Sequence, residues 1–219
     1  GIGNPIPELS NLPGASRPGG GGGGGGGGVS QVDNLYSYEF DGTGSYFDAG
    51  NPTALQFTGD FSISGWFKSS SATNQRIISK DDGTNRSYLV QLQSNGVVRG
   101  TIFQSNSGKN VDSATGFADG NWHHFVFTYE HGIGTKIYVD NGTPTVNSLA
   151  TAVDNDSSIV TIGARGDGAN VFNGYIDEIA LFNTVLNATN VENIYNATTT
   201  GKTADLSSLS PVAWYRMGD

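Results

Sequence analysis

Apolar and polar residues alternate in short runs through most of the chain after about residue 29. In the run FSISGWFKS (residues 61–69), for example, Phe61, Ile63 and Phe67 are separated by small residues or by Trp66. Because successive side chains of a strand point to opposite faces, a period of two indicates strands with one buried face. Short runs of this kind, broken by turn residues, are typical of a β-sandwich, which we assign to residues 29–198.

The clearest strand lies in the run GNWHHFVFTYEHGIGTKIYVDNGT (residues 120–143). Its alternation predicts that one face carries Trp122, His124, Val126 and Thr128 and the other carries His123, Phe125, Phe127 and Tyr129. The dipeptides Asn95-Gly96 and Asn141-Gly142 predict two-residue hairpin turns, since both central positions of such turns need a positive φ. The large side chains that we expect to be buried are Trp66, Phe67, Trp122, Phe125, Phe127 and Ile179.

One short helix is predicted from Thr189 to Tyr195. Thr189 and Glu192 have the spacing of a capping box, in which each side chain satisfies a backbone N–H at the start of the helix. Val191, Ile194 and Tyr195 then share one face of the helix.

The first 28 residues differ in composition from the rest of the chain. Residues 1–18 carry four prolines, which forbid a regular helix and favour an extended arm. Residues 19–28 are ten consecutive glycines, which have no side chain to bury and lose much conformational freedom on ordering. Contacts with other subunits or with a particle surface would offset that cost, so we predict self-association through residues 1–28. The candidate assembly positions are Pro18, Gly19, Gly22, Gly25 and Gly28.

The charge balance narrows the range of partners. The formal net charge is −9 and no basic stripe exists, which argues against nucleic acid and anionic membranes as partners. No apolar run approaches the length that spans a bilayer, so no membrane insertion is expected. The chain has no cysteine, which excludes a disulfide framework and any thiolate nucleophile or metal ligand.

Several motifs resemble, in order, those of laminin-G-like, concanavalin-A-like jelly-roll domains of the lectin and glucanase superfamily. The run GNWHHFVFTYE with the following YVDNG is similar to the signature hairpin of that family. The runs YEFDGTGSYFDAG, FSISGWFKS, IISKDD and VTIGARGDGANVFNGYIDEIALFNTVLNATNVENIYN resemble its other strands and closing helix. The resemblance spans residues 36–197 and implies an all-β, antiparallel two-sheet jelly-roll sandwich, here with an extended N-terminal arm. Glu130-His131 departs from the family pattern, which has Asp-Gly after the tyrosine.

Residues 199–219 are predicted to form a linker and a strand. The closing run SPVAWYRMGD (residues 210–219) resembles the first strand of a following module of the same kind. It fits equally well as the last strand of this domain, and the sequence leaves both alternatives open.

Catalysis is not expected. Glycoside hydrolysis on this fold needs a pair of carboxylates, but the chain has five glutamates and lacks the alternating E-x-D-x-x-E motif. Asp177 and Glu178 are adjacent, and neighbouring strand residues point to opposite faces. The same argument separates His123 and His124, which therefore cannot chelate one ion.

Two kinds of site follow from the resemblance. Members of the family often carry one structural Ca²⁺, and Asp41 and Asp177 match its carboxylate positions; the alternative is that each only accepts a hydrogen bond in a turn. The loop after the IG strand lies on the sandwich rim in this family, where side chains can bind sugar hydroxyls. The candidate carbohydrate-binding residues are Arg86, Tyr88, Arg99, Arg165 and Asp167, with plain solvent-exposed residues as the alternative.

Two functions are compatible with these observations. The first is a non-catalytic, lectin-like module on a virion or cell surface that binds surface glycans. The second is a purely structural fibre, filament or capsid-decoration subunit. The arm NPIPELSNLPGASRPGG and the closing AWYRMGD resemble segments of structural proteins of marine tailed phages, which favours an extracellular or virion-surface location.

Overall fold

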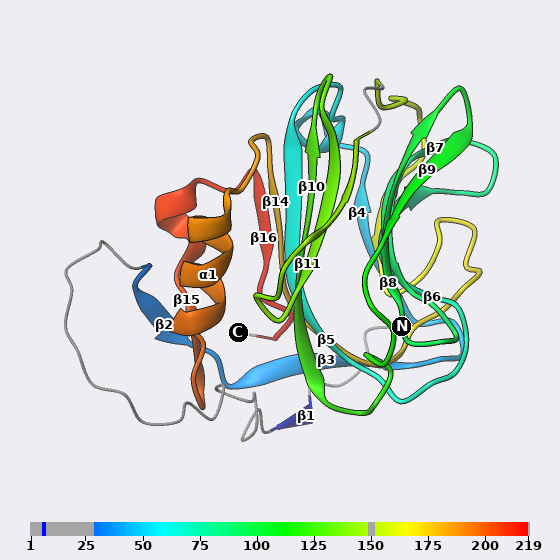
Figure 1. Ribbon diagram of the computed structural model, residues 1–219. Coiled ribbons are helices and arrows are strands. Elements are labelled where there is room, and N and C mark those ends of the chain that lie inside the picture. The colour runs from blue at the N-terminus through cyan, green and yellow to red at the C-terminus, as the bar shows by residue number, and fades with distance from the viewer. Residues whose placement is uncertain (1–5, 8–28, 149–151, 219) are drawn as a thin grey trace.

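Two antiparallel sheets pack face to face in the computed structural model, which describes residues 6–7, 29–148 and 152–218 (Figure 1). The larger sheet has the order β1-β3-β14-β5-β10-β11-β12, and β16 also pairs with β14. Its eight strands within the described residues are β1 (Ile6–Pro7), β3 (Tyr36–Asp41), β5 (Phe61–Lys68), β10 (Trp122–Glu130), β11 (Gly134–Val139), β12 (Thr145–Asn147), β14 (Asn173–Phe182) and β16 (Ala213–Tyr215).

The second sheet has the order β4-β13-β6-β7-β8-β9. Its strands are β4 (Phe47–Gly50), β6 (Gln75–Asp81), β7 (Arg86–Leu92), β8 (Val98–Gln104), β9 (Ser107–Asp112) and β13 (Val160–Ile162). A two-stranded ladder joins β2 (Gln31–Asp33) to β15 (Lys202–Ala204), and short 3-10 turns cover η1 (Thr53–Leu55) and η2 (Leu206–Leu209). The predicted all-β jelly-roll sandwich is confirmed. The predicted assembly positions in residues 18–28 lie outside the described residues.

The core between the sheets follows from the alternation along β10. Phe125, Phe127 and Tyr129 point toward the six-stranded sheet and have no exposed surface. Val126 points to the opposite side and joins a second apolar cluster. The six side chains predicted to be buried are all at most 7% exposed: Trp66, Phe67, Trp122, Phe125, Phe127 and Ile179.

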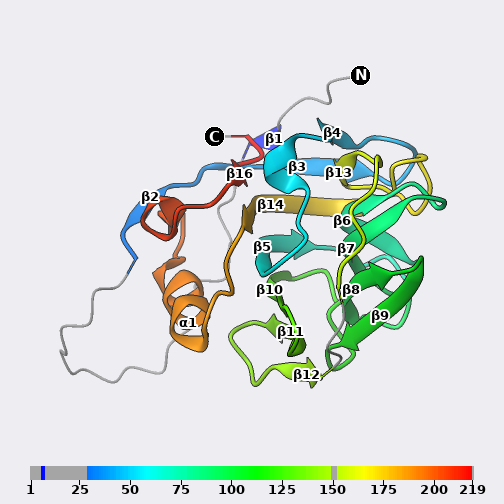
Figure 2. The ribbon, with the colours of Figure 1, turned by 90° about the horizontal axis from the view of Figure 1, so that it is seen from above.

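The helix α1 (Ala188–Ala197) covers the outer face of the eight-stranded sheet, on the side away from the six-stranded sheet (Figure 1; Figure 2). Val191 and Ile194 are buried against that face, and Tyr195 stacks on Trp66 with ring centroids 5.8 Å apart. No helix in the described part of the chain is long and apolar enough to cross a membrane.

The predicted helix cap was wrong. Asn187 is the N-cap and its side chain accepts from the backbone N–H of Asn190, whose own side chain accepts from the N–H of Asn187. Asparagine is among the best N-cap residues, so the capping box begins two residues before Thr189.

Both hairpin turns also differ from the prediction. In the first, Gly96 alone of the dipeptide has positive φ and donates to the carbonyl of Gln93, which makes a longer loop. In the second, Asp140 and Asn141 take the two positive φ values, so the turn lies one residue earlier than predicted. Asparagine and aspartate tolerate this left-handed region better than most residues, which allows the shift.

The C-terminal run lies on this domain. Residues Ala213–Tyr215 form β16, which pairs with Ile179–Leu181 of β14. Trp214 packs partly buried against the outer apolar cluster, beside η2 and α1. Of the two alternatives for residues 210–219, the structure thus shows the arrangement in which they complete this sheet.

One lysine is buried inside the sandwich. Lys80 of β6 lies in register with Val160 and Tyr88 and has no exposed surface. Its Nζ donates to the carbonyl oxygens of Asp156 at 2.6 Å and Ser158 at 2.9 Å, and to Asp156 Oδ1 at 3.2 Å. The ammonium thereby ties the loop before β13 to the sheet.

Candidate functional site

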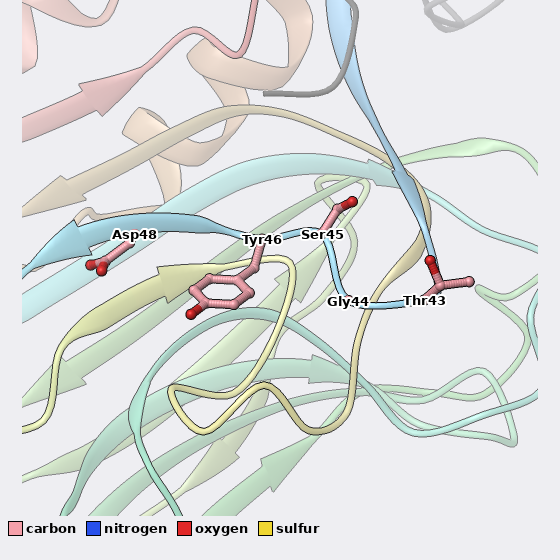
Figure 3. Close-up of a pocket in the computed structure, with 5 residues that line it drawn as sticks. All are labelled: Thr43, Gly44, Ser45, Tyr46 and Asp48. Atoms are coloured by element: carbon pink, nitrogen blue, oxygen red, sulfur yellow. The ribbon is translucent and has the colours of Figure 1, made fainter. Parts of the chain in front are cut away.

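A polar hollow of about 450 Å³ lies at the connection between β3 and β4 (Figure 3). It is lined by Thr43, Gly44, Ser45, Tyr46 and Asp48. Residues 42–46, which connect the two strands, include no aliphatic residue that would draw them into the core. Both neighbouring strands are anchored by pairing, β3 to β14 and β4 to β13. The connection therefore stays at the surface, with its hydroxyl and carboxylate groups accessible.

An exposed aromatic side chain borders the hollow. Tyr46 is 41% exposed, and its neighbour Phe47 is 45% exposed while contacting Tyr215 at a ring-centroid distance of 5.5 Å. Large aromatic side chains are usually buried, so one that lines a hollow and stays accessible is a candidate ligand platform. Sequence reasoning missed this segment, although its polar GTGSY run between two strands was visible.

Two carboxylates give the hollow a negative field. Asp48 lines it and accepts from the N–H of Gly50 at 2.7 Å. Asp41, two residues before Thr43, accepts from the Thr43 N–H at 2.8 Å. That backbone hydrogen bond is the main cause that lowers the pKa of Asp41 below its usual value.

Of the four charged residues predicted to bind carbohydrate, three lie close to the buried carboxylate of Asp81: Arg86, Arg165 and Asp167. Asp81, which has no exposed surface, is bonded by Arg86 Nε at 3.2 Å and by Arg76 Nη2 at 3.3 Å. The carbonyl of Asp81 accepts from the N–H of Gly166, which brings the loop of Arg165 and Asp167 to the same rim.

Each of these arginines is engaged by a carboxylate. Arg165 holds Asp167 through two hydrogen bonds of 2.8 and 2.6 Å, and this pairing is the main cause that lowers the pKa of Asp167 to about 2. Arg99 holds Asp112 in the same way, with two bonds of 2.6 Å, on β8 and β9. Arg86 and Arg165 lie at one end of the six-stranded sheet, whereas Arg99 lies nearer the other end. The four charged candidates, which include Asp167, therefore do not form one site.

Tyr88 does not belong to any surface site, and this prediction was wrong. Its ring has no exposed surface and packs against Phe57 and Phe61, while its hydroxyl donates to the carbonyl of Leu55 at 3.0 Å. The alternation of β7 that buries Val90 and Leu92 also buries Tyr88.

The two predicted calcium ligands are far apart. Asp41 lies opposite Asn173 at the start of β14, and Asp177 follows four residues later, about 13 Å along the strand. The oxygens of Asp177 accept from Asn34 Nδ2 at 3.0 Å and from the N–H of Glu178 at 2.8 Å. Among the described residues, no three His, Asp or Glu side chains are grouped to hold a metal ion. Ca²⁺ also takes backbone carbonyl and water oxygens as ligands, so one calcium at either aspartate stays a prediction.

Asp177 and Glu178 also correct the argument from strand alternation. A register shift occurs between Asp177 and Ala180, and Glu178 has φ 52°, which marks a β-bulge. Both carboxylates consequently lie on the outer side of the sheet: Asp177 meets Asn34, and Glu178 accepts from Trp214 Nε1 at 2.6 Å. They are 0% and 2% exposed, beneath the chain that surrounds them.

The two histidines have separate structural contacts. His123 bonds Asp140 Oδ2 at 2.7 Å and Asp119 Oδ1 at 3.0 Å, and so joins two loops. His124 contacts Ser64 Oγ at 3.0 Å on the other face, and burial lowers its pKa to about 4. The prediction that they face opposite sides is confirmed.

A family match agrees with this architecture. The family model described as Concanavalin A-like lectin/glucanases superfamily matches residues 41–192, more than half of the chain. The chain belongs to this family. A relative, the Adhesion G-protein coupled receptor V1 of Danio rerio, is 29% identical over 199 residues, which cover 80% of this chain and 3% of the receptor. The chain therefore spans only a small part of that protein.

Similar solved structures show the same fold at low sequence identity. A presumed carbohydrate-binding protein from Bacteroides ovatus matches with a TM-score of 0.61 and 13% identity, over 87% of this chain and 52% of its own. The binding domain of Botulinum Neurotoxin DC in complex with SialylT gives 0.59 and 17%, over 78% and 45%. The heptameric SAP-like pentraxin of Limulus polyphemus gives 0.52 and 14%, over 72% and 80%. These matches do not test the resemblance of the terminal segments to phage proteins, which stays a prediction.

Proposed function

We propose that this domain is a non-catalytic glycan-binding module and that it binds a saccharide in the hollow between β3 and β4. The observation that carries the proposal is the lining: the hydroxyl-bearing residues Thr43, Ser45 and Tyr46 and the carboxylate of Asp48 border one accessible hollow along the connection between the two strands (Figure 3). Sugar hydroxyls both donate and accept, so they match hydroxyl and carboxylate partners, while an aromatic ring packs on the apolar face of a sugar. The volume is in the usual range for small-ligand sites.

The comparisons support the ligand class. One structural neighbour is described as a presumed carbohydrate-binding protein, and another is a binding domain in complex with SialylT. Because those chains are less than 25% identical to this one, they are evidence for the fold only. The evidence for the position of the site is the lining of the hollow.

The carboxylates support binding without turnover. A glycoside hydrolase needs one carboxyl group that keeps its proton near neutral pH beside a second, ionised one. Asp41, the carboxylate next to the hollow, has a lowered pKa, the opposite of what a general acid needs. The adjacent pair Asp177 and Glu178 is buried on the outer side of the eight-stranded sheet, in β14, and does not line the hollow.

The proposal includes an extracellular or virion-surface location and an assembly role for residues 1–28. The alternative is a structural subunit that binds no glycan. Replacing Gly22 to Gly25 with bulky residues should prevent assembly and leave the sandwich folded, which light scattering and circular dichroism would show. Calcium at Asp41 or Asp177 stays a prediction, and a chelator-dependent thermal shift would test it.

Glycan-array screening followed by calorimetry with the best neutral glycan tests the binding site. Tyr46→Ala should weaken binding about tenfold or more, whereas Tyr46→Phe, which keeps the ring, should lose less. The matched control is Tyr36→Ala, which removes a tyrosine of similar exposure (38%) from β3, outside the hollow. If no glycan binds, the alternative of a purely structural subunit replaces this proposal. If Tyr46→Ala binds like the wild type, the hollow is not the site.

A further inference from the structure

We propose that the hollow selects uncharged glycans and rejects acidic ones, and that Asp41 contributes to this selection from outside the lining. The inference rests on the proposed function. Its starting point is that, among the residues that the structure describes, the ionisable groups lining the hollow are the Asp48 carboxylate and the Tyr46 phenol, with no lysine or arginine.

Asp41 adds a second negative charge at a fixed place. The turn Asp41-Gly42-Thr43 is closed by the hydrogen bond from the Thr43 N–H to Asp41 Oδ1 at 2.8 Å. Thr43 itself lines the hollow, so the carboxylate is held within hydrogen-bonding distance of the backbone of a lining residue. An aspartate is already ionised at neutral pH, and this hydrogen bond lowers the pKa of Asp41 further, so its charge is present across the neutral pH range.

No cation compensates these two charges within the lining. The arginines on the six-stranded sheet are committed elsewhere: Arg165 to Asp167, Arg99 to Asp112, and Arg86 to Asp81. The chain as a whole carries a formal charge of −9, which adds a repulsive background to an anionic ligand. A carboxylated or sulfated sugar would therefore meet two anions and no partner, whereas a neutral hydroxyl would donate to Asp48.

The expected discrimination is moderate. Two unit charges at roughly 7 Å in a solvent-exposed site weaken the binding of an anion about tenfold. The effect must shrink with salt, because the Debye length falls from about 10 Å at 0.1 M to about 3 Å at 1 M. Salt-sensitive rejection of the acidic sugar is thus the signature of this mechanism, and a steric mechanism would not show it.

Calorimetry with a matched sugar pair tests the inference. The pair is the best neutral oligosaccharide from the array and its derivative in which one primary alcohol is oxidised to a carboxylate. The wild type should bind the acidic sugar about tenfold more weakly at low salt and nearly equally at 1 M salt. Asp41→Asn keeps the oxygen that accepts from Thr43 and removes the charge, so it should reduce the difference to about threefold.

The chain offers a matched control for Asp41→Asn. Asp82-Gly83-Thr84 repeats the same turn, with Asp82 Oδ1 accepting from the Thr84 N–H at 2.9 Å. Asp82 is away from the hollow. Phe47 of β4 and Ile78 of β6 both pair with Ile162 of β13, so they share one row of the sheet. Asp82 comes just after the end of β6, four residues beyond Ile78, which is about 14 Å of extended chain. Asp82→Asn changes the net charge equally and should leave the discrimination at its wild-type value.

The outcomes separate the two proposals. If neither sugar binds, the proposed function fails and this inference fails with it. If the neutral sugar binds and the acidic sugar binds as tightly or more tightly, the inference alone is overturned. Equal effects of Asp41→Asn and Asp82→Asn would likewise overturn it, because they would show that net charge, not the charge beside Thr43, sets the preference.

Discussion

The contact between Gly100 and Phe127 makes the packing of the two sheets directly testable. Gly100 of β8 faces Phe127 of β10, and a Cβ placed on Gly100 would lie 2.2 Å from Cδ2 and 2.4 Å from Cε2 of that ring. Carbon atoms need about 3.5 Å, so Gly100→Ala must push the ring by about 1.3 Å within a close-packed core. Overpacking of this kind costs about 1–3 kcal/mol, against a gain of about 0.4–1 kcal/mol from the less flexible unfolded chain.

We therefore expect Gly100→Ala to lower the free energy of unfolding by about 1–2 kcal/mol. Phe127→Leu should cost a similar amount on its own, because the smaller side chain leaves space beside Gly100. In the double variant the new methyl group occupies that space, so its cost should be at least about 1 kcal/mol below the sum of the two single costs. Urea unfolding followed by tryptophan fluorescence gives all three values. Strict additivity, within about 0.5 kcal/mol, would refute the proposed contact.

Two further predictions concern buried ionisable groups. Burial disfavours charge on His123, but its hydrogen bonds to Asp140 and Asp119 and their charges outweigh burial and raise its pKa above 6.5. The stability it adds is complete below about pH 6.5 and is lost as the pH rises through the raised pKa, so urea unfolding should show this loss in the wild type and not in His123→Gln. Glu178→Leu removes both carboxylate oxygens, so the indole N–H of Trp214 and the guanidinium of Arg216 each lose an acceptor. This change should lower the free energy of unfolding by about 1–3 kcal/mol and alter the fluorescence of Trp214. An unchanged midpoint of unfolding would show that these contacts add nothing.

The alternation of apolar and polar residues correctly predicted which face of a strand is buried wherever the strand is regular. Along β10 the apolar and polar positions keep a period of two, and the side chains face the sides that this period predicts. The same rule failed at Asp177 and Glu178 because a bulge inserts a residue and turns both carboxylates to one side. A bulge depends on the pairing of β14 with β5 and β16, which no local pattern encodes.

The candidate site was harder to predict than the fold. Tyr88 shares its alternation with Val90 and Leu92, so the sequence itself contained the argument for burial. The hollow around Tyr46 has no periodic signal, because its shape depends on how β3 and β4 are held by partners in two different sheets. Sequence patterns identify faces of strands, whereas a site in a connection requires the relative placement of the sheets.

Because the ammonium group of Lys80 is buried, chemical labelling of this residue can measure how often the sandwich opens. Its Nζ donates to three oxygens of Asp156 and Ser158 and Lys80 has no exposed surface, so an amine-reactive reagent reaches it only when the loop before β13 or the sandwich itself opens. The other lysines of the folded domain, such as Lys202, are accessible and should be labelled at once. The rate at which Lys80 acquires the label would therefore report how often this part of the native sandwich opens, without any denaturant.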